Sequence, residues 1–154
     1  VGVRVEWRIW ANDTSNNWEN TEIQHLTTIS GNQAPYSPAL TGPANNTRYD
    51  MGGSILFEWV FDDPDIGDTQ GAYEFELDND PAFGSPEIDT GKVVSGSESV
   101  NQNLPSSIDD YYWRLKTWDD SDEESPWSAT RYVIADRVRV KHIEANDTRN
   151  DVAA

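Results

Sequence analysis

One stretch of the chain decides the fold: Tyr111-Tyr112-Trp113-Arg114-Leu115-Lys116-Thr117. Its large apolar residues stand at every second position, which predicts a β-strand with one buried face and one face toward water. The same period of two recurs in four other runs, at residues 3–9, 55–61, 73–77 and 132–134. Almost no helical period is found, so the sequence predicts an all-β protein.

Turn-forming residues separate these predicted strands. They include Gly52-Gly53, Asp63-Pro64-Asp65, Asn79-Asp80-Pro81 and Leu104-Pro105-Ser106-Ser107, and their Gly, Pro, Asp and Asn residues favour tight changes of direction. Short strands that alternate with turns at intervals of about ten residues are typical of a β-sandwich. We therefore predict an antiparallel Greek-key sandwich.

The sequence also repeats itself. Glu6-Trp7-Arg8-Ile9, followed by a polar loop and Trp18, resembles Tyr112-Trp113-Arg114-Leu115, followed by a polar loop and Trp127. Such self-similarity predicts tandem modules. The expected parts are the last strands of a preceding module at 1–30, a linker at 31–37, a complete module at 38–135 and the first strand of a following module at 136–154.

The composition excludes several classes of protein. The 154 residues hold 28 acidic and 11 basic side chains, which gives a net charge of −17. This charge repels phosphates, so we expect no nucleic-acid partner, and no apolar run is long enough for insertion into a membrane. The 7 Trp, 6 Tyr and 4 Phe argue against a disordered acidic tail. Without cysteine there is no disulfide, no thiolate metal site and no cysteine nucleophile.

Several of these segments together resemble a known family of modules. They are Trp59, the run Asp63 to Gln70, the run Ala72 to Leu77, Asp89-Thr90-Gly91-Lys92-Val93, Leu104-Pro105, the run Tyr111 to Leu115, and Ser125-Pro126-Trp127-Ser128. The set is similar to the fibronectin type III-like, or immunoglobulin-like, β-sandwich modules of prokaryotic, including archaeal, cell-surface and secreted multidomain proteins. The resemblance implies the fold but no particular activity, because such modules serve as spacers, adhesins and accessory parts of carbohydrate-active enzymes.

Two tryptophans are expected to form the centre of the core. Trp59 and Trp113 occupy inward positions on strands that should face each other across the two sheets, and each can bury about 150–250 Å². Trp127 follows an acidic loop close to the outward Arg114 and Arg131, which predicts a stacked Trp–Arg surface.

Other aromatic residues have more specialised predictions. Tyr111 fits a tyrosine corner, in which its hydroxyl bonds back to the preceding loop. The tryptophans as a group are interpreted first as structural, with a sugar-binding platform as the alternative. The best candidates for that platform, because strand parity or loop position should leave them exposed, are Trp10, Trp18 and Trp118.

No catalytic motif is present in the sequence. Patterns for a nucleophile elbow, a phosphate-binding loop, a dinucleotide site or a zinc protease are absent. The two histidines, His25 and His142, lie outside the predicted complete module. A carboxylate pair for glycoside hydrolysis would need a cleft, which nothing in the sequence indicates. We therefore expect a protein that is not an enzyme.

Two acidic clusters follow the Trp59 and Trp113 strands, and both should lie at the pole of the sandwich that the linker enters. Crowded carboxylates repel each other, and Ca²⁺ relieves this repulsion by accepting six to eight oxygen ligands. The alternative is that the aspartates cap turns, or reflect a saline habitat. The candidate Ca²⁺ ligands are Asp62, Asp63, Asp65, Asp68, Asp119, Asp120 and Asp122.

These observations together predict an extracellular, cell-surface protein. Three Asn-x-Thr sequons mark candidate glycosylation sites at Asn12, Asn45 and Asn146. The expected function is structural: a non-enzymatic module of a tandem array that serves spacing, adhesion, or assembly of a surface layer or filament. The alternative is a carbohydrate-binding accessory module of a secreted enzyme. The expected partners are neighbouring modules or subunits of the same protein, joined through the unpaired strands at 1–30 and 136–154, and cell-surface glycans.

Overall fold

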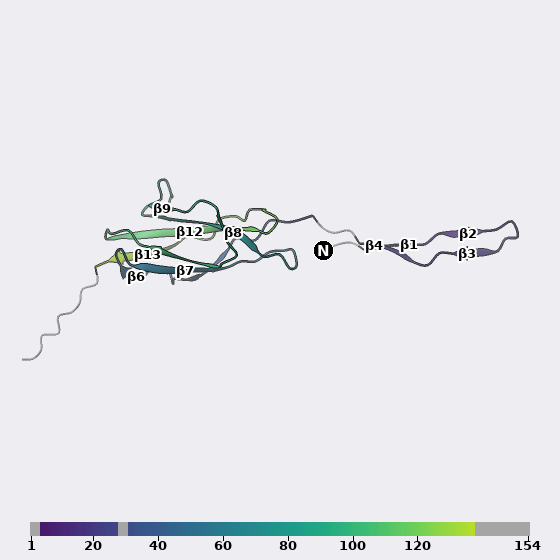
Figure 1. Ribbon diagram of the computed structural model, residues 1–154, viewed down its shortest axis with the longest axis horizontal. Coiled ribbons are helices and arrows are strands. Elements are labelled where there is room, and N and C mark those ends of the chain that lie inside the picture. The colour runs from purple at the N-terminus through teal and green to yellow at the C-terminus, as the bar shows by residue number, and fades with distance from the viewer. Residues whose placement is uncertain (1–3, 28–30, 138–154) are drawn as a thin grey trace, which may run out of the picture. The chain divides into compact units, whose positions relative to one another are not determined.

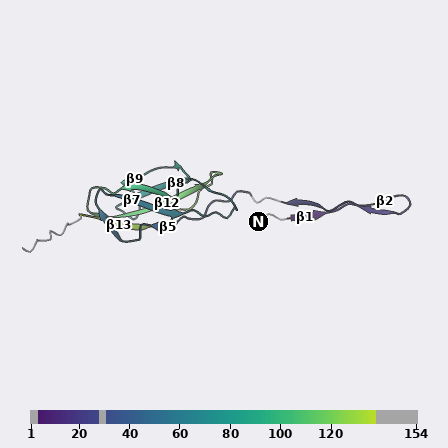
Figure 2. The ribbon, with the colours of Figure 1, turned by 60° about the horizontal axis from the view of Figure 1, so that its bottom comes forward.

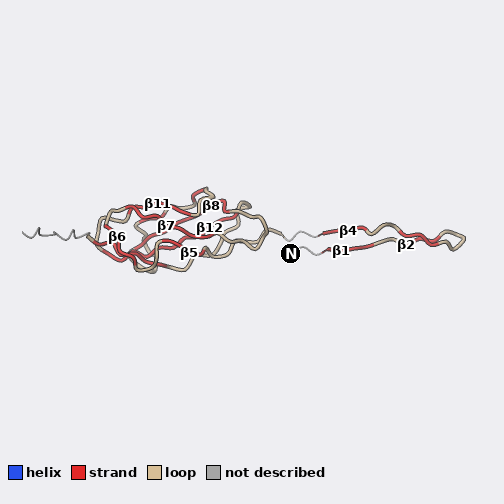
Figure 3. Tube along the Cα trace, turned by 90° about the horizontal axis from the view of Figure 1, so that it is seen from below, coloured by secondary structure: helices blue, strands red, loops and turns tan. Residues whose placement is uncertain are grey.

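A computed structural model of the chain describes residues 4–27 and 31–137. The chain divides into two compact units, Val1–Gln33 and Ala34–Ala154, and each is described by itself. Strands and loops make up the described parts of both units, with no helix among them (Figure 3). None of these parts therefore forms an apolar helix of membrane-spanning length.

The first unit is a two-stranded hairpin (Figure 1). Each arm of the hairpin contains two short strands, so that β1 pairs antiparallel with β4 and β2 pairs antiparallel with β3. All described side chains of this unit are exposed. The strands are β1 (Arg4–Trp7), β2 (Trp10–Asn12), β3 (Trp18–Asn20) and β4 (Gln24–Thr27).

The second unit is a β-sandwich whose two sheets lie face to face (Figure 1; Figure 2). One sheet has the order β11–β7–β5, and the other has the order β10–β8–β12–β13–β6 with β9 also paired to β8. The strands of the first sheet are β5 (Ala39–Gly42), β7 (Ser54–Val60) and β11 (Ser99–Asn103). Those of the second are β6 (Thr47–Asp50), β8 (Gln70–Asp78), β9 (Ile88–Asp89), β10 (Val93–Val94), β12 (Asp109–Asp119) and β13 (Arg131–Asp136).

The predicted sandwich is confirmed, with one difference in strand direction. Every described strand pair is antiparallel except β13 with β6, which is parallel. After β5 the chain crosses from one sheet to the other, and β6 then lies along the free edge of β13. Alternation of apolar residues identifies the buried face of a strand but says nothing about its direction, so the sequence could not reveal this pair.

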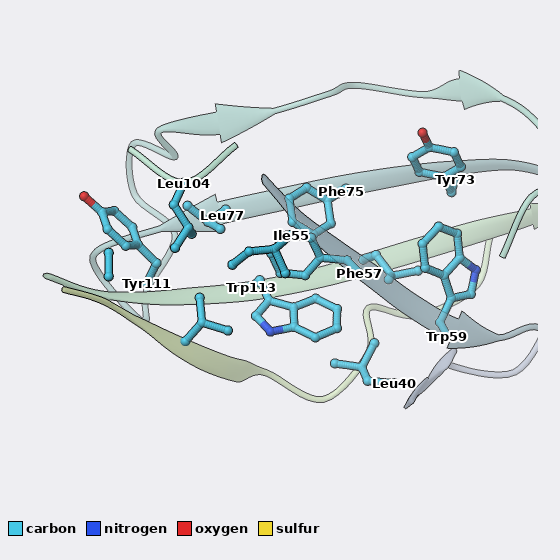
Figure 4. Close-up of a cluster of buried hydrophobic side chains, with 13 residues drawn as sticks. Leu40, Ile55, Phe57, Trp59, Tyr73, Phe75, Leu77, Leu104, Tyr111 and Trp113 are labelled. Carbon is cyan, nitrogen blue, oxygen red and sulfur yellow. The ribbon is translucent and has the colours of Figure 1, made fainter. Parts of the chain in front are cut away.

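The core lies between β7 of one sheet and β8 and β12 of the other (Figure 4). Phe57 is its centre: its ring lies 4.8 Å from that of Phe75 and 4.9 Å from that of Trp113. Trp59 and Trp113 point inward as predicted, with exposed fractions of 2% and 0%. They do not form the central contact by themselves, because Phe57 joins the sheets and Trp59 packs on Tyr73 at 5.2 Å.

Two polar contacts orient the large core residues. The hydroxyls of Tyr111 and Ser107 share a hydrogen bond of 2.5 Å, which confirms the predicted link from Tyr111 back to the preceding loop. The indole Nε1–H of Trp59 donates to Oε1 of Gln70 at 2.7 Å. The Nε2 amide of Gln70 in turn donates to the carbonyls of Ser95 and Ser97, so both ends of this buried side chain are used.

The compact unit begins a few residues before the predicted module boundary at residue 38. Pro35 and Pro38 are buried, and the backbone N–H of Tyr36 donates to the carbonyl of Asp62 at 3.0 Å. Part of the segment predicted as a linker, 31–37, therefore packs on the sandwich. At the other end β13 extends to Asp136. The strand predicted for 136–154 otherwise lies outside the described residues.

The hydrogen bond to Gln70 gives a matched pair of substitutions. Trp59→Phe and Trp113→Phe remove similar volumes from the core, but only Trp59→Phe leaves a buried oxygen without its donor, since Nε1 of Trp113 has no hydrogen-bond partner. An unsatisfied buried polar group costs about 1–3 kcal/mol. We expect Trp59→Phe to lower the free energy of unfolding by that much more than Trp113→Phe. Urea denaturation measures the difference, and equal losses would contradict the role of Gln70.

Candidate functional site

Cations and aromatic rings alternate on the outer face of the larger sheet. The guanidinium of Arg114, on β12, lies 4.1 Å from the ring centre of Phe83 and 4.3 Å from that of Trp127. The ammonium of Lys116, two residues later, lies 4.8 Å from Trp127. The predicted stacking of Arg114 on Trp127 is therefore confirmed. Such contacts stabilise by about 0.5–1 kcal/mol where exposed and about 2 kcal/mol where desolvated.

The stack continues to the end of β12. Lys116 lies 5.1 Å from the ring centre of Trp118, and Lys92, which follows β9, lies 4.4 Å from the same ring. Lys92 also forms an ion pair with Asp122. Together the residues Phe83, Arg114, Trp127, Lys116, Trp118 and Lys92 form what we call the outer stack.

Carboxylates on strand β8 and in the loop after β12 neutralise Arg114 and Lys116 of the outer stack. Nε of Arg114 donates to Glu76 of β8 at 2.7 Å, and Nζ of Lys116 lies 3.3 Å from Glu74 and 2.9 Å from Glu124. Burial lowers the pKa of Lys116, but the hydrogen bond to Glu124 and the charge of Glu74 outweigh it and leave that pKa raised. Lys116 is therefore charged at neutral pH, as a cation–π contact requires.

Two serines hold Trp127 over the sheet. Oγ of Ser128 accepts from the N–H of Leu115 at 3.1 Å, and the N–H of Ser128 donates to the carbonyl of Leu115 at 2.8 Å. Ser125 makes the same pair of contacts with Thr117, both at 2.9 Å. The segment between the two serines thus runs along the edge of β12 like a further strand.

Two predictions about outward residues are wrong. Trp118 was expected to be exposed and available as a sugar platform, but it is only 6% exposed. It does lie on the outer face, where Lys92 and Lys116 cover it. Arg131 was expected to point outward near Trp127, but it is opposite the inward Trp113, and its guanidinium donates to the carbonyls of Leu40 and Pro43. It bridges the crossing chain to β13 instead.

The other two platform candidates are exposed, as predicted. Trp10 and Trp18 have exposed fractions of 57% and 60%. In the β2–β3 pair Trp10 is opposite Asn20 and Asn12 is opposite Trp18. Residues opposite each other in an antiparallel pair share a face, so the two rings and two amides lie on the same face of the hairpin.

The acidic clusters come together only in part. Asp63, Asp65 and Asp68 present carboxylate oxygens that all lie within 4.8 Å of one another, so this group could bind a metal ion. Oδ2 of Asp63 is buried without a hydrogen-bond partner, while its Oδ1 accepts from the N–H of Asp65 at 2.7 Å. Asp62 is outside the group, and its backbone carbonyl contacts the Tyr36 N–H.

The second acidic loop lies close enough to act on the first. Partial desolvation raises the pKa of the Asp68 carboxyl, and the nearby charges of Asp120, Asp63, Asp65 and Asp119 raise it further. Asp119 is 2% exposed, and its Oδ1 caps the turn by accepting from the N–H groups of Ser121 and Glu123. Asp122 faces Lys92. The two loops therefore share one pole of the sandwich.

The candidate glycosylation sites differ in their surroundings. Asn12 is exposed on β2, and its side-chain amide donates to Asn16 at 3.3 Å. Asn45 is exposed in the loop before β6, where its Oδ1 accepts from the N–H of Tyr132 at 2.9 Å. Asn146 lies outside the described residues.

Sequence reasoning missed Lys116 of the outer stack and the two glutamates of β8 that pair with the stack. Glu74, Glu76 and Lys116 are polar residues at outward strand positions, where they resemble ordinary solvated side chains. Their opposite charges on two long strands were the only signal in the sequence. The β8–β12 register, which pairs Arg114 with Glu76 and Lys116 with Glu74, is set by tertiary structure.

Comparison with known proteins places this sandwich in a family. The sequence matches the family described as "Rha78A-like, N-terminal immunoglobulin domain" over residues 53–135. No curated protein sequence matches the chain.

Solved structures support the same fold. An α-L-rhamnosidase from Dictyoglumus thermophilum matches 73% of this chain with 19% identity and a TM-score of 0.59, and an α-L-rhamnosidase from Streptomyces avermitilis matches 64% with 23% identity and a TM-score of 0.55. The matches cover 13% and 10% of those enzymes. The fibronectin(III)-like modules of Clostridium thermocellum CbhA match 92% of the chain and 66% of their own length, with 11% identity and a TM-score of 0.53.

The outer stack predicts an unequal response to the loss of two arginines. Arg114→Met keeps an apolar side chain but leaves Glu76, whose side chain is 11% exposed, without its 2.7 Å partner. Because hydrogen bonds to charged groups contribute about 1.5–3 kcal/mol, we expect the free energy of unfolding to fall by about 2–3 kcal/mol. In the control Arg48→Met the pair with Asp136 is exposed, and a loss below about 1 kcal/mol is expected. Similar losses in urea denaturation would contradict the stack.

The acidic pole predicts a pH-dependent gain from a neutral substitution. The raised pKa of Asp68 means that the folded state holds this proton more tightly than the unfolded chain, whose value is 3.8. Asp68 therefore lowers stability above its folded pKa, and this effect disappears as the pH falls below 3.8. In metal-free buffer Asp68→Asn should raise the melting temperature at neutral pH and give no gain below 3.8. A melting temperature lowered at neutral pH would refute the sign of this effect.

Proposed function

Because the chain belongs to the family of Rha78A-like N-terminal immunoglobulin domains, we propose that its sandwich is a non-catalytic accessory module of a larger carbohydrate-active protein. Within that protein its role is structural: it holds neighbouring modules at a fixed spacing. The relatives of known structure favour this context, because two of them are α-L-rhamnosidases in which the matching part is a small fraction of the enzyme. They favour it over adhesion or assembly of a surface layer or filament.

The outer stack carries this proposal. A sugar platform needs open aromatic faces, whereas cations of the chain itself lie over the rings of Trp118 and Trp127. Internal ion pairs and cation–π contacts thus occupy the outer face of β12 from Arg114 to Trp118, while the core covers its inner face. A sheet that is packed on both sides resists bending, which suits a spacer.

The charged groups also argue against catalysis. Glu74, Glu76 and Asp89 come within 4.8 Å of one another, which resembles a catalytic cluster. However, Glu76 is paired with Arg114 and Glu74 with Lys116, so each of these glutamates already has a partner within the chain. No histidine lies between residues 31 and 137.

A second candidate function rests on the hairpin. Trp10 and Trp18 are exposed on the same face as the amides of Asn12 and Asn20. Exposed rings with adjacent hydrogen-bonding groups suit stacking on a sugar, so carbohydrate binding by this face is the alternative to a purely structural role.

Calcium binding at the acidic pole is a further part of the proposal. Asp63, Asp65 and Asp68 would supply the ligands, and the buried Oδ2 of Asp63 would gain the partner that it lacks. The proposed setting is extracellular, where Ca²⁺ is abundant and where the exposed Asn12 and Asn45 would be open to glycosylation.

Affinity electrophoresis in gels containing a rhamnose-rich polysaccharide separates the two candidate functions. We expect no retardation of the protein and no hydrolysis of an aryl α-L-rhamnoside. Retardation that is lost in the double variant Trp10→Ala/Trp18→Ala, but kept when the exposed Tyr36 is changed to Ala, would favour the carbohydrate-binding alternative. Retardation of the double variant, or hydrolysis, would overturn the proposed structural role.

Thermal unfolding with and without calcium tests the acidic pole. Millimolar CaCl₂ should raise the melting temperature and a chelator should reverse the rise, because a ligand that binds only the folded state stabilises it. The Asp68→Asn variant should lose this response, whereas Asp62→Asn, outside the three-carboxylate group, should keep it. Equal melting curves with CaCl₂ and chelator, or a response that matched NaCl reproduces, would remove calcium from the proposal.

A further inference from the structure

The hairpin of the first unit repeats the strand register of the β12–β13 pair. In the hairpin Trp7 is opposite Gln24 and Val5 is opposite Leu26. In the sandwich Trp113 is opposite Arg131 and Tyr111 is opposite Val133. If Trp7 is aligned with Trp113, then Val5 aligns with Tyr111, Gln24 with Arg131 and Leu26 with Val133.

The loops at the two tips also have the same internal hydrogen bonds. Oδ1 of Asp13 accepts from the N–H groups of Ser15 and Asn17 at 2.8 and 2.9 Å. Oδ1 of Asp119 accepts from the corresponding groups of Ser121 and Glu123 at 2.9 and 2.8 Å. The residue before the last has a positive φ in both loops: 63° at Asn16 and 74° at Asp122.

A third correspondence lies in the segments that return from the two tips, before β4 and before β13. The N–H of Ile9 donates to Oγ1 of Thr21 at 3.0 Å, and the N–H of Thr21 donates to the carbonyl of Ile9 at 3.0 Å. Leu115 and Ser128 make the same two contacts in the sandwich, at 3.1 and 2.8 Å. Register, tip and returning segment therefore agree, although no sheet packs against the hairpin among the described residues of the first unit.

What differs is burial. The hairpin residues Val5, Trp7, Ile9 and Leu26 are 46%, 47%, 62% and 54% exposed. Their counterparts in the sandwich, Tyr111, Trp113, Leu115 and Val133, are at most 1% exposed. In the sandwich the opposite sheet covers this face, with Phe57 4.9 Å from Trp113.

The other face of the hairpin is suited to water. Glu6 is opposite His25, and its carboxylate lies 3.1 Å from Arg4 and 3.5 Å from His25. The hairpin therefore has one apolar face and one charged face, as the strands of a sandwich do. An isolated two-stranded hairpin of this kind is only marginally stable in water.

We infer that residues 4–27 are the last hairpin of a second sandwich of the same family, and that their apolar face docks on a polypeptide segment equivalent to residues 34–109. That segment supplies the counterparts of β5 to β11 and covers Trp7 as Phe57 covers Trp113. A second copy of this chain does not fit, because its own β12 and β13 already fill the place that the hairpin would take. This inference does not rest on the accessory role proposed above.

A fusion that retains the whole described protein tests the inference. A copy of residues 34–109 is joined directly to Arg4, so that the first sandwich would consist of this added segment and the hairpin. Amide hydrogen exchange by NMR reports on Val5, Trp7 and Leu26. We expect their exchange to slow by roughly a hundredfold or more relative to the unfused chain, because buried strands exchange only on larger openings.

Two variants keep the result interpretable. Trp7→Asp in the fusion should abolish the protection, whereas Glu6→Gln on the charged face should keep it. Unchanged hairpin exchange in the fusion would overturn the inference, and so would protection that survives Trp7→Asp, since that would indicate unspecific collapse. A third variant of the fusion, with Val5→Tyr, Ile9→Leu and Leu26→Val, gives the hairpin the inward residues of β12 and β13. Protection in this variant, without protection in the fusion that has the native hairpin, would also overturn the inference. The hairpin's own apolar face would then not dock on the added segment.

Discussion

Strand β12 has contacts on both of its faces from Trp113 to Trp118, and the rest of the sandwich is arranged around that constraint. On the inner side Trp113 meets Phe57 of the opposite sheet at 4.9 Å. On the outer side Arg114 and Lys116 lie between aromatic rings and pair with glutamates of β8. Because no disulfide can join the sheets of this chain, these two layers of aromatic contact hold the central strand in place.

The outer layer uses three of the eleven basic residues of this strongly acidic protein. Arg114, Lys116 and Lys92 lie on one face, where each contacts a ring and a carboxylate. Negative charge is then left in excess at the pole formed by the loops after β7 and β12. The same separation of charge stabilises the sheet and leaves Asp63, Asp65 and Asp68 as a group that could bind a metal ion.

The two units present the same supersecondary element in two environments. The β12–β13 hairpin is complete, because the opposite sheet and the outer stack cover its faces. The hairpin formed by β1 to β4 has the same register and tip, which local hydrogen bonds such as those of Asp13 are sufficient to form. Local chemistry thus specifies the hairpin, and burial of its apolar face requires a further sheet.

The sequence by itself determined the alternation of β12, the inward direction of Trp59 and Trp113, the contact of Tyr111 with the preceding loop and the stacking of Arg114 on Trp127. These properties follow from strand parity and from residues close along the chain. Tertiary structure alone decided the burial of Trp118, the inter-sheet role of Arg131 and the parallel pairing of β6. Each depends on residues distant in sequence. Lys92 lies over the ring of Trp118, and the carbonyl of Leu40 accepts a hydrogen bond from Arg131. Strand parity identifies the face on which a side chain lies, but only the packed chain determines what covers that face.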